Sequence, residues 1–156
     1  MLTPQVIIYT DGSSRGNPGP GGYGVVLMAG QLRKELSEGY RLTTNNRMEL
    51  MAVIKGLEAL KKANTRVLVY SDSKYVVDAV EKGWLQGWLR TNFKGGKKNP
   101  DLWRRFHTIY TQHQVRFQWV KGHADNPYNN RCDELATEAA DHAAHLVDEW
   151  FEQNRD

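Results

Sequence analysis

Two carboxylates follow apolar runs that could be neighbouring strands of one sheet. Asp11 follows the β-branched and aromatic run at 6–10, and Asp72 follows a similar run at 66–70. If the two runs are parallel neighbours, both acids lie at the carboxyl edge of the sheet, where open α/β sheets place their sites. Each acid also has a simpler interpretation, because Asp11 with Gly12 is a common turn sequence and Asp72 or Ser71 could cap a helix.

Two further acids, Glu49 and Asp133, fall on predicted helices. Glu49 lies at the edge of the apolar face of a helix expected within 43–62, where a carboxylate is costly unless it is paired or bound to metal. Asn46 followed by Glu49 also fits an Asn-led capping box, which is the alternative. Asp133 lies on the alanine-rich side of the last predicted helix, which could approach the sheet closely. Alternatively, Asp133 is only a favourable charge near a helix N-terminus.

Carboxylates that converge repel one another, and a hard divalent cation relieves that repulsion. An oxygen-only ligand set suits Mg²⁺ or Mn²⁺. Two such ions about 3.5–4 Å apart can hold both the attacking and the leaving oxygen of a phosphodiester cleavage. The sequence contains no CxxC, HExxH or Walker A motif, and the prolines in the glycine-rich run 16–22 exclude a dinucleotide fingerprint. The acids therefore point to phosphoryl chemistry with two metal ions.

The elements that would position these acids predict an α/β fold built on a mixed five-stranded sheet with helices on both faces. Strands are expected at 6–10, 23–29, 32–42, 66–70 and 115–120, and helices at 43–62, 72–80, 84–89, 101–113 and from 127 onward. Short turns join the first three strands, which favours antiparallel pairing, whereas helices separate the later strands and favour parallel pairing. Asn126 is expected to cap the last helix, with Pro127 at its first position. We expect one domain over 1–156.

The composition is that of a globular protein, with 40% hydrophobic and 25% charged residues among 156. No apolar run is long enough to span a membrane, and the N-terminal residues lack the pattern of a signal peptide. The single cysteine, Cys132, excludes an internal disulfide and suits a reducing compartment. We expect a cytoplasmic monomer.

Basic residues are concentrated in one stretch of the chain. Residues 82–105 contain seven lysines and arginines against Asp101 alone, a net charge of +6, so the remainder of this +3 chain carries −3. Four aromatic residues, Trp84, Trp88, Phe93 and Trp103, are interleaved with these charges. A local basic patch of this kind is the electrostatic footprint of a nucleic-acid partner. The simpler interpretation is a set of core tryptophans with a solvated charged loop, which we expect for Trp103.

Four runs resemble the ribonuclease HI family, and they occur in the family's order over nearly the whole chain. They are TDGSSRGNPGPGGYG (10–24), TTNNRMELMA (43–52), SDSKYV (71–76) and WVKGHADNPYNNRCDELA (119–136). The resemblance implies a ribonuclease H-like fold and hydrolysis of the RNA strand of RNA–DNA hybrids, leaving 5′-phosphate and 3′-hydroxyl ends. It implies Mg²⁺ ligands at Asp11, Glu49, Asp72 and Asp133. It also implies that His123 assists proton transfer and product release, which the near-neutral titration of histidine suits.

The same resemblance implies contacts with the hybrid. Gly12, Ser13, Asn17, Asn45 and Asn46 would read the minor groove and its 2′-hydroxyls, which are within reach of short side chains. Thr44 would bind a DNA phosphate, Tyr75 and Trp84 would lie against DNA sugars, and Lys94, Lys97 and Lys98 belong to the family's basic protrusion. The loop at 93–103 is a few residues shorter than the family pattern, and Lys74 stands where a glutamine is common. Other functions left open are a hybrid-binding module without activity and a related nuclease such as a junction resolvase.

Overall fold

A five-stranded mixed sheet forms the centre of the protein in the computed structural model, which describes residues 3–122, 126–142 and 145–155. Its strands are β1 (Val6–Ser14), β2 (Gly19–Ala29), β3 (Leu32–Thr43), β4 (Arg66–Ser71) and β5 (Gln114–Trp119), in the order β3-β2-β1-β4-β5. The first three strands pair antiparallel, and β4 pairs parallel with both β1 and β5. This confirms the fold class predicted from the pattern of short turns and crossovers.

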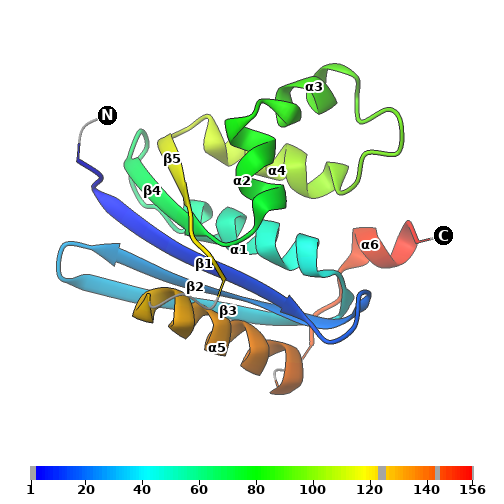
Figure 1. Ribbon diagram of the computed structural model, residues 1–156, viewed down its shortest axis with the longest axis horizontal. Coiled ribbons are helices and arrows are strands. Elements are labelled where there is room, and N and C mark those ends of the chain that lie inside the picture. The colour runs from blue at the N-terminus through cyan, green and yellow to red at the C-terminus, as the bar shows by residue number, and fades with distance from the viewer. Residues whose placement is uncertain (1–2, 123–125, 143–144, 156) are drawn as a thin grey trace.

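Helices cover both faces of the sheet (Figure 1). On one side lie α1 (Asn45–Glu58), α2 (Lys74–Glu81), α3 (Trp84–Arg90) and α4 (Pro100–Tyr110), and on the other lies α5 (Pro127–His142). A short helix that the sequence analysis missed, α6 (Glu149–Gln153), follows near the C-terminus. No helix in the described ranges is long and apolar enough to cross a membrane.

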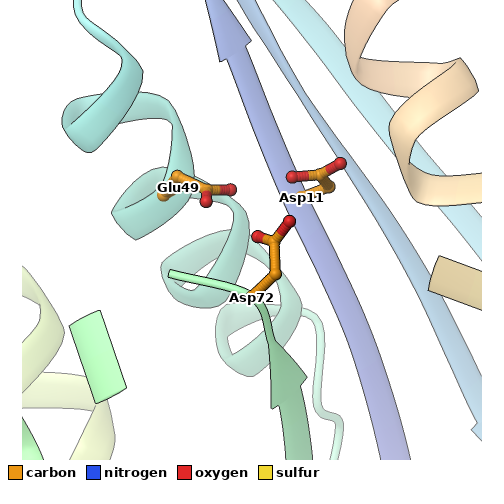
Figure 2. Close-up of side chains that lie close together, drawn as sticks. All are labelled: Asp11, Glu49 and Asp72. Carbon is orange, nitrogen blue, oxygen red and sulfur yellow. The ribbon is translucent and has the colours of Figure 1, made fainter. Parts of the chain in front are cut away.

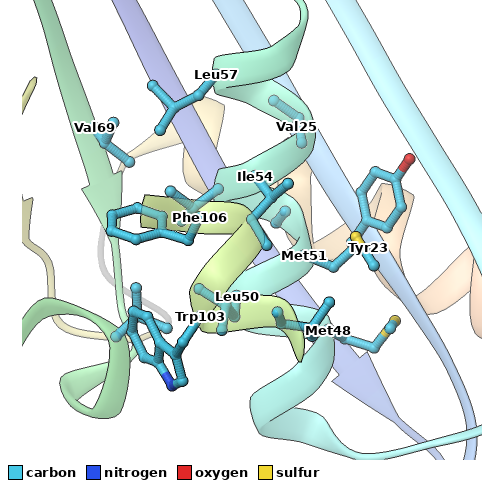
Figure 3. Close-up of a cluster of buried hydrophobic side chains, with 14 of the residues drawn as sticks. Tyr23, Val25, Met48, Leu50, Met51, Ile54, Leu57, Val69, Trp103 and Phe106 are labelled. Carbon is cyan, nitrogen blue, oxygen red and sulfur yellow. The ribbon is translucent and has the colours of Figure 1, made fainter. Parts of the chain in front are cut away.

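The main hydrophobic core fills the space between α1, α4 and the sheet. Ile54 and Leu57 of α1 are completely buried, as are Trp103 and Phe106 of α4, and Figure 3 shows these side chains packed together. The core position of Trp103 confirms that this tryptophan is structural. Because α1 is anchored along its length, the side chains of its first turns have fixed positions relative to the sheet.

On the other face, α5 lies directly against the backbone of the sheet. A Cβ atom at Gly24 would come within 2.3 Å of the Cys132 carbonyl oxygen, and one at Gly39 within 2.1 Å of the Ala139 carbonyl oxygen. Both distances are far below van der Waals contact, so only glycine allows this approach. The expectation that the small residues of α5 let it approach closely is confirmed, and the contact brings Asp133 to the sheet.

Several predicted boundaries were wrong. Asp11 lies within β1 and pairs with Gly24, because the glycine-rich run 19–24 forms the start of β2 and not only a loop. Thr44, not Asn46, caps α1: its side chain accepts a hydrogen bond from the Arg47 N–H at 3.2 Å. Ser73, not Ser71 or Asp72, caps α2.

Asn126 does cap α5, and its Oδ1 accepts hydrogen bonds from the N–H groups of Tyr128 and Asn129 at 2.9 and 3.2 Å. The predicted helix start with Pro127 at its first position is confirmed. The first helix ends at Glu58 and the fourth at Tyr110, a few residues earlier than expected. These differences at helix ends do not move any of the four acids off the elements that position them.

Candidate active site

Three of the four predicted acids meet where β1, β4 and α1 converge (Figure 2). Asp11 comes from β1, Asp72 follows the end of β4, and Glu49 comes from the second turn of α1. One carboxylate oxygen from each lies within 4.8 Å of the other two. The pairing of β1 with β4 in parallel register sets the two aspartates side by side, as their positions after two apolar runs predicted.

Close packing between α1 and β1 fixes the third acid. A Cβ atom at Gly12 would lie 2.3 Å from the Glu49 backbone nitrogen, so the helix touches the strand where only glycine fits. The Gly12 N–H donates to a carboxylate oxygen of Glu49 and also, at 2.9 Å, to Oδ1 of Asp11. Glu49 is only 6% exposed. The capping-box alternative for Glu49 is wrong, because its carboxylate faces β1 and not the start of its own helix.

The acids are held in an environment that disfavours their charged forms. Burial raises the pKa of Asp11 to about 7, and repulsion by Asp72 and Asp133 adds to this rise. Burial also raises the pKa of Glu49 well above its usual value, with further repulsion from Asp11 and Asp72. Like charges gathered in a poorly solvated place cost free energy of folding, and such perturbed groups cluster at functional sites.

The fourth predicted acid, Asp133, borders the same site. A cavity of about 20 Å³, enough for roughly one water-sized particle, lies beside Asp11 and Asp72. Its lining includes Asp11, Asp72 and Asp133, together with Gly122 from the loop after β5. The structure therefore places all four predicted acids around one centre, with Glu49 on the α1 side and Asp133 on the α5 side.

The residues present fit a hard divalent cation. Every candidate donor is a carboxylate oxygen, the type that Mg²⁺ and Mn²⁺ prefer. Among the described residues, Oδ1 of Asp72 is buried and has no hydrogen-bond partner. An unpaired carboxylate oxygen next to two other acids is costly, and a cation satisfies it. The cluster is thus arranged as a site for a hard metal cation.

Two contacts around Asp72 were not predicted from the sequence. The Trp119 Nε1–H donates to the Asp72 carbonyl oxygen at 3.2 Å, and the Lys74 ammonium lies 4.3 Å from the centre of the Trp119 ring. On α5, Oδ1 of Asn129 is buried without a partner among the described residues, and Asn129 lines the small cavity. Its position four residues before Asp133, on the same helix face, was the available signal.

The predicted groove-reading residues lie next to the acids. Asn17, in the turn between β1 and β2, accepts a hydrogen bond from the Asn45 N–H at 3.0 Å through its Oδ1. Asn45 and Asn46 are exposed, and Thr44 is partly buried at the start of α1. Gly12 and Ser13 continue β1 past Asp11. His123, the predicted proton-transfer residue, lies outside the described residues.

The residues predicted to contact the DNA strand and its phosphates differ in exposure. Trp84 is 44% exposed, and Lys94, Lys97 and Lys98 are exposed on the loop before α4. Tyr75 is only partly exposed: its ring packs beside Trp88 and Trp103, and its hydroxyl accepts hydrogen bonds from Asn99 and Trp103 at 3.0 and 2.7 Å.

Comparison with known proteins agrees with this fold and site. Residues 3–141 match the family model described as RNase H. The chain is 59% identical over 143 residues to the ribonuclease H of Syntrophus aciditrophicus (strain SB), covering 89% of this chain and 82% of that protein.

Two solved structures extend the comparison to three dimensions. One is LC9-RNase H1, a type 1 RNase H with the type 2 active-site motif, at a TM-score of 0.79 and 33% identity over 90% of this chain and 74% of the other. Another is LC11-RNase H1 in complex with an RNA/DNA hybrid, at a TM-score of 0.61 and 31% identity over 87% of this chain and 96% of the other.

The sheet order, the helices on both faces and the acids at the junction of β1 and β4 define a nuclease of the ribonuclease H fold. The match to the family model and the sequence identity to the Syntrophus enzyme show that the chain belongs to the ribonuclease H family. Its activity is that of a ribonuclease H, and the acidic cluster of Asp11, Glu49 and Asp72 is consistent with the active site of such an enzyme.

Proposed function

We propose that this enzyme hydrolyses the RNA strand of RNA–DNA hybrids and that Asp11, Glu49, Asp72 and Asp133 hold two Mg²⁺ ions, for which Mn²⁺ could substitute. Two observations carry the proposal together: one carboxylate oxygen from each of Asp11, Glu49 and Asp72 lies within 4.8 Å of the other two, and Oδ1 of Asp72 is buried with no hydrogen-bond partner among the described residues. The LC11-RNase H1 complex with an RNA/DNA hybrid supports the choice of substrate.

When bound, the metal ions would supply an activated water and stabilise the leaving oxygen, so that cleavage leaves 5′-phosphate and 3′-hydroxyl ends. The protein's part is to fix the carboxylates. The Gly12 N–H orients both Asp11 and Glu49, and the Trp119 indole N–H holds the main chain of Asp72. These contacts hold the acids at close range despite their repulsion.

Selection of the RNA strand would depend on contacts with sugars and not with bases. Gly12, Ser13, Asn17, Asn45 and Asn46 lie beside the acids, where they can bond to 2′-hydroxyls of the wide, shallow minor groove. Thr44 would bind a DNA phosphate, and Tyr75 and Trp84 would lie against the DNA sugars. The exposed Lys94, Lys97 and Lys98 would bind phosphates at a distance from the cut bond, so that binding weakens steeply with salt.

His123 is proposed to move a proton and to help the product leave. Replacing His123 with alanine should lower kcat by about 10²–10⁴, the usual range for general acid–base help, and should leave Mg²⁺ affinity unchanged. Calorimetry would show a loss of Mg²⁺ affinity if His123 were a metal ligand instead, and that result would overturn the proposed role.

Cleavage of three labelled duplexes side by side tests the proposed activity. With Mg²⁺, the RNA of an RNA–DNA hybrid should be cut, whereas RNA–RNA and DNA–DNA duplexes should stay intact, and EDTA should abolish cutting. Binding of the hybrid without cleavage would instead identify a binding module, and cleavage of branched DNA would identify a resolvase.

We further propose that the enzyme acts as a monomer in the cytoplasm, which sedimentation and fractionation would test.

A further inference from the structure

A second cavity lies away from the acids, between α6 and the loop that precedes α4. It has a volume of about 490 Å³ and is lined by Pro18, Lys97, Lys98, Trp150, Phe151 and Arg155, among others. Three of these side chains are cationic and two are aromatic, and none of the described residues in the lining is acidic. Cations beside aromatic rings are the lining that suits a sugar-phosphate backbone.

The short helix α6 is firmly attached, so its side of the cleft has a defined shape. Arg41 of β3 forms a two-pronged ion pair with Glu152, with N···O distances of 2.7 and 2.9 Å. The Arg47 guanidinium lies 5.1 Å from the centre of the Trp150 ring, and the Arg155 guanidinium lies 5.7 Å from that of Phe151. The backbone N–H of Arg41 also donates to the Leu146 carbonyl oxygen at 2.9 Å.

The cleft lies near the start of α1, the helix that carries Glu49. Pro18 lines the cleft, and its neighbour Asn17 bonds to Asn45 in the first turn of α1. Glu49 follows four residues later, about 6 Å along the helix axis. Figure 1 shows α6 beside the β1–β2 turn and the start of α1. A duplex bound at the acids can therefore extend along this edge toward the cleft.

We propose that the cleft between α6 and residues 96–100 binds a backbone phosphate of the hybrid outside the cleavage site, with Arg155, which follows α6, as its cation and Trp150 of α6 as a surface for the adjoining sugar. This assignment rests on the proposed function. It adds to the basic segment a second arm, which comes from the C-terminal helix. The two arms face each other across the cleft, with Lys97 and Lys98 on one side and Arg155 on the other.

The test compares Arg155→Gln with Lys62→Gln, an exposed lysine that follows α1 and is not among the residues lining either cavity. In Arg155→Gln, KM for a long hybrid should rise several-fold with kcat unchanged, the pattern of lost uniform binding. The slope of log affinity against log salt should flatten by about 0.9, the value for one phosphate contact. Lys62→Gln should change neither quantity. Trp150→Phe, which keeps an aromatic ring over Arg47, should raise KM by less.

Neutral methylphosphonate linkages identify the strand. Two modified hybrids are compared: one has the neutral linkages in the DNA strand beyond the cut site, and the other has them in the RNA strand. The KM difference between wild type and Arg155→Gln should disappear only when the modified strand is the one that occupies the cleft. Equal KM and equal salt slope in wild type and Arg155→Gln would overturn the inference even though the hybrid is cleaved normally. Absence of cleavage by the wild type would instead refute the proposed function, so the two failures are distinguishable. Thermal unfolding of each variant confirms that it is folded.

Discussion

Two buried charged clusters lie on the same helix, two residues apart, and they are built in opposite ways. Glu49 faces two other acids, whereas Arg47, only 1% exposed, faces the carboxylates of Asp101 and Asp148. Arg47 donates to Asp148 at 2.7 and 2.9 Å and to Asp101 at 2.7 and 2.8 Å. One cluster is complete without a ligand, and the other leaves a buried oxygen of Asp72 without a hydrogen-bond partner in the part of the chain that the structure describes.

The difference separates stability from activity. The Arg47 cluster ties the start of α1 to α4 through Asp101 and to the segment before α6 through Asp148. Asp148 also accepts a hydrogen bond from Thr43 Oγ1 at 2.8 Å, which adds the end of β3 to the cluster. The acid cluster opposes folding and is held in place by that framework. We therefore expect substitutions at Arg47 to act mainly on the free energy of unfolding and substitutions at the acids to act mainly on rate.

The largest expected effect is on rate. Asp11→Asn or Asp72→Asn should lower the cleavage rate by far more than tenfold with the fold intact, because a carboxylate that binds metal is lost and repulsion falls. Rate assays with Mg²⁺, combined with circular dichroism, measure both. A variant that keeps more than about a tenth of the wild-type rate would have lost less than roughly 1.4 kcal/mol of barrier lowering, too little for a metal-bridging ligand.

The next effect is on stability. Arg47→Met should lower the free energy of unfolding by about 3–5 kcal/mol, because Asp148 is then a buried charge without its partner. The matched control is Arg15→Met, which breaks an exposed two-pronged pair with Asp141 and should change the free energy of unfolding far less, because solvent screens the pair. Urea unfolding of both variants gives the two values. Equal losses would show that burial of the Arg47 pair has no special role.

The two partners of Arg47 should also differ from each other. The Asp148 side chain is 6% exposed and that of Asp101 is 23% exposed. Replacing Asp148 with asparagine should therefore cost more, about 2–3 kcal/mol, than the same change at Asp101, about 1–2 kcal/mol, since solvent can compensate at the more exposed site. Urea unfolding of the two variants should rank them in that order. The reverse order would contradict the importance of burial here.

The smallest effect depends on pH in the absence of metal. The pKa of Asp11 is raised to about 7 by burial and by Asp72. The folded state therefore holds this proton more tightly than the unfolded state, so stability falls as pH rises from about 4 through 7. In EDTA, Asp11→Asn should be more stable than wild type by about 1–2 kcal/mol at pH 8, and this gain should shrink toward pH 4. An equal gain in stability at pH 8 and pH 4 would show that the raised pKa of Asp11 is not the cause of the gain.

The sequence was sufficient for the mixed sheet, with antiparallel first strands and parallel later ones, and for the convergence of Asp11, Glu49 and Asp72, because their signals are local. Apolar runs predict strands, and acids next to such runs predict the edge where they meet. Arg47 carried no such signal, since its partners lie 54 and 101 residues away along the chain. The short α6 was missed for the same reason: tertiary contacts with Arg41 and Arg47 support it, and five residues have little intrinsic helical stability.

Residues 19–22 were left outside the strand predicted at 23–29, because glycine usually marks a loop. Here the absence of side chains is what the strand requires, since α5 and α1 both lie against it. A Cβ atom at Gly22 would fall 2.6 Å from the Ala136 carbonyl oxygen, and one at Gly21 would fall 2.6 Å from the Thr43 side chain. The requirement for glycine at these positions becomes visible only once the neighbouring elements are in place.

Calorimetric titration of Mg²⁺ into the metal-free enzyme at pH 6 tests the central claim, that the acid cluster is held together for a cation. Because the pKa values of Asp11 and Glu49 are raised, metal binding should displace protons, and the measured heat should depend on the ionisation enthalpy of the buffer. Asp72→Asn should weaken binding strongly, and Asp78→Asn, an acid on α2 outside the cluster, should not. Binding without proton release, or equal affinity in wild type and Asp72→Asn, would contradict the account.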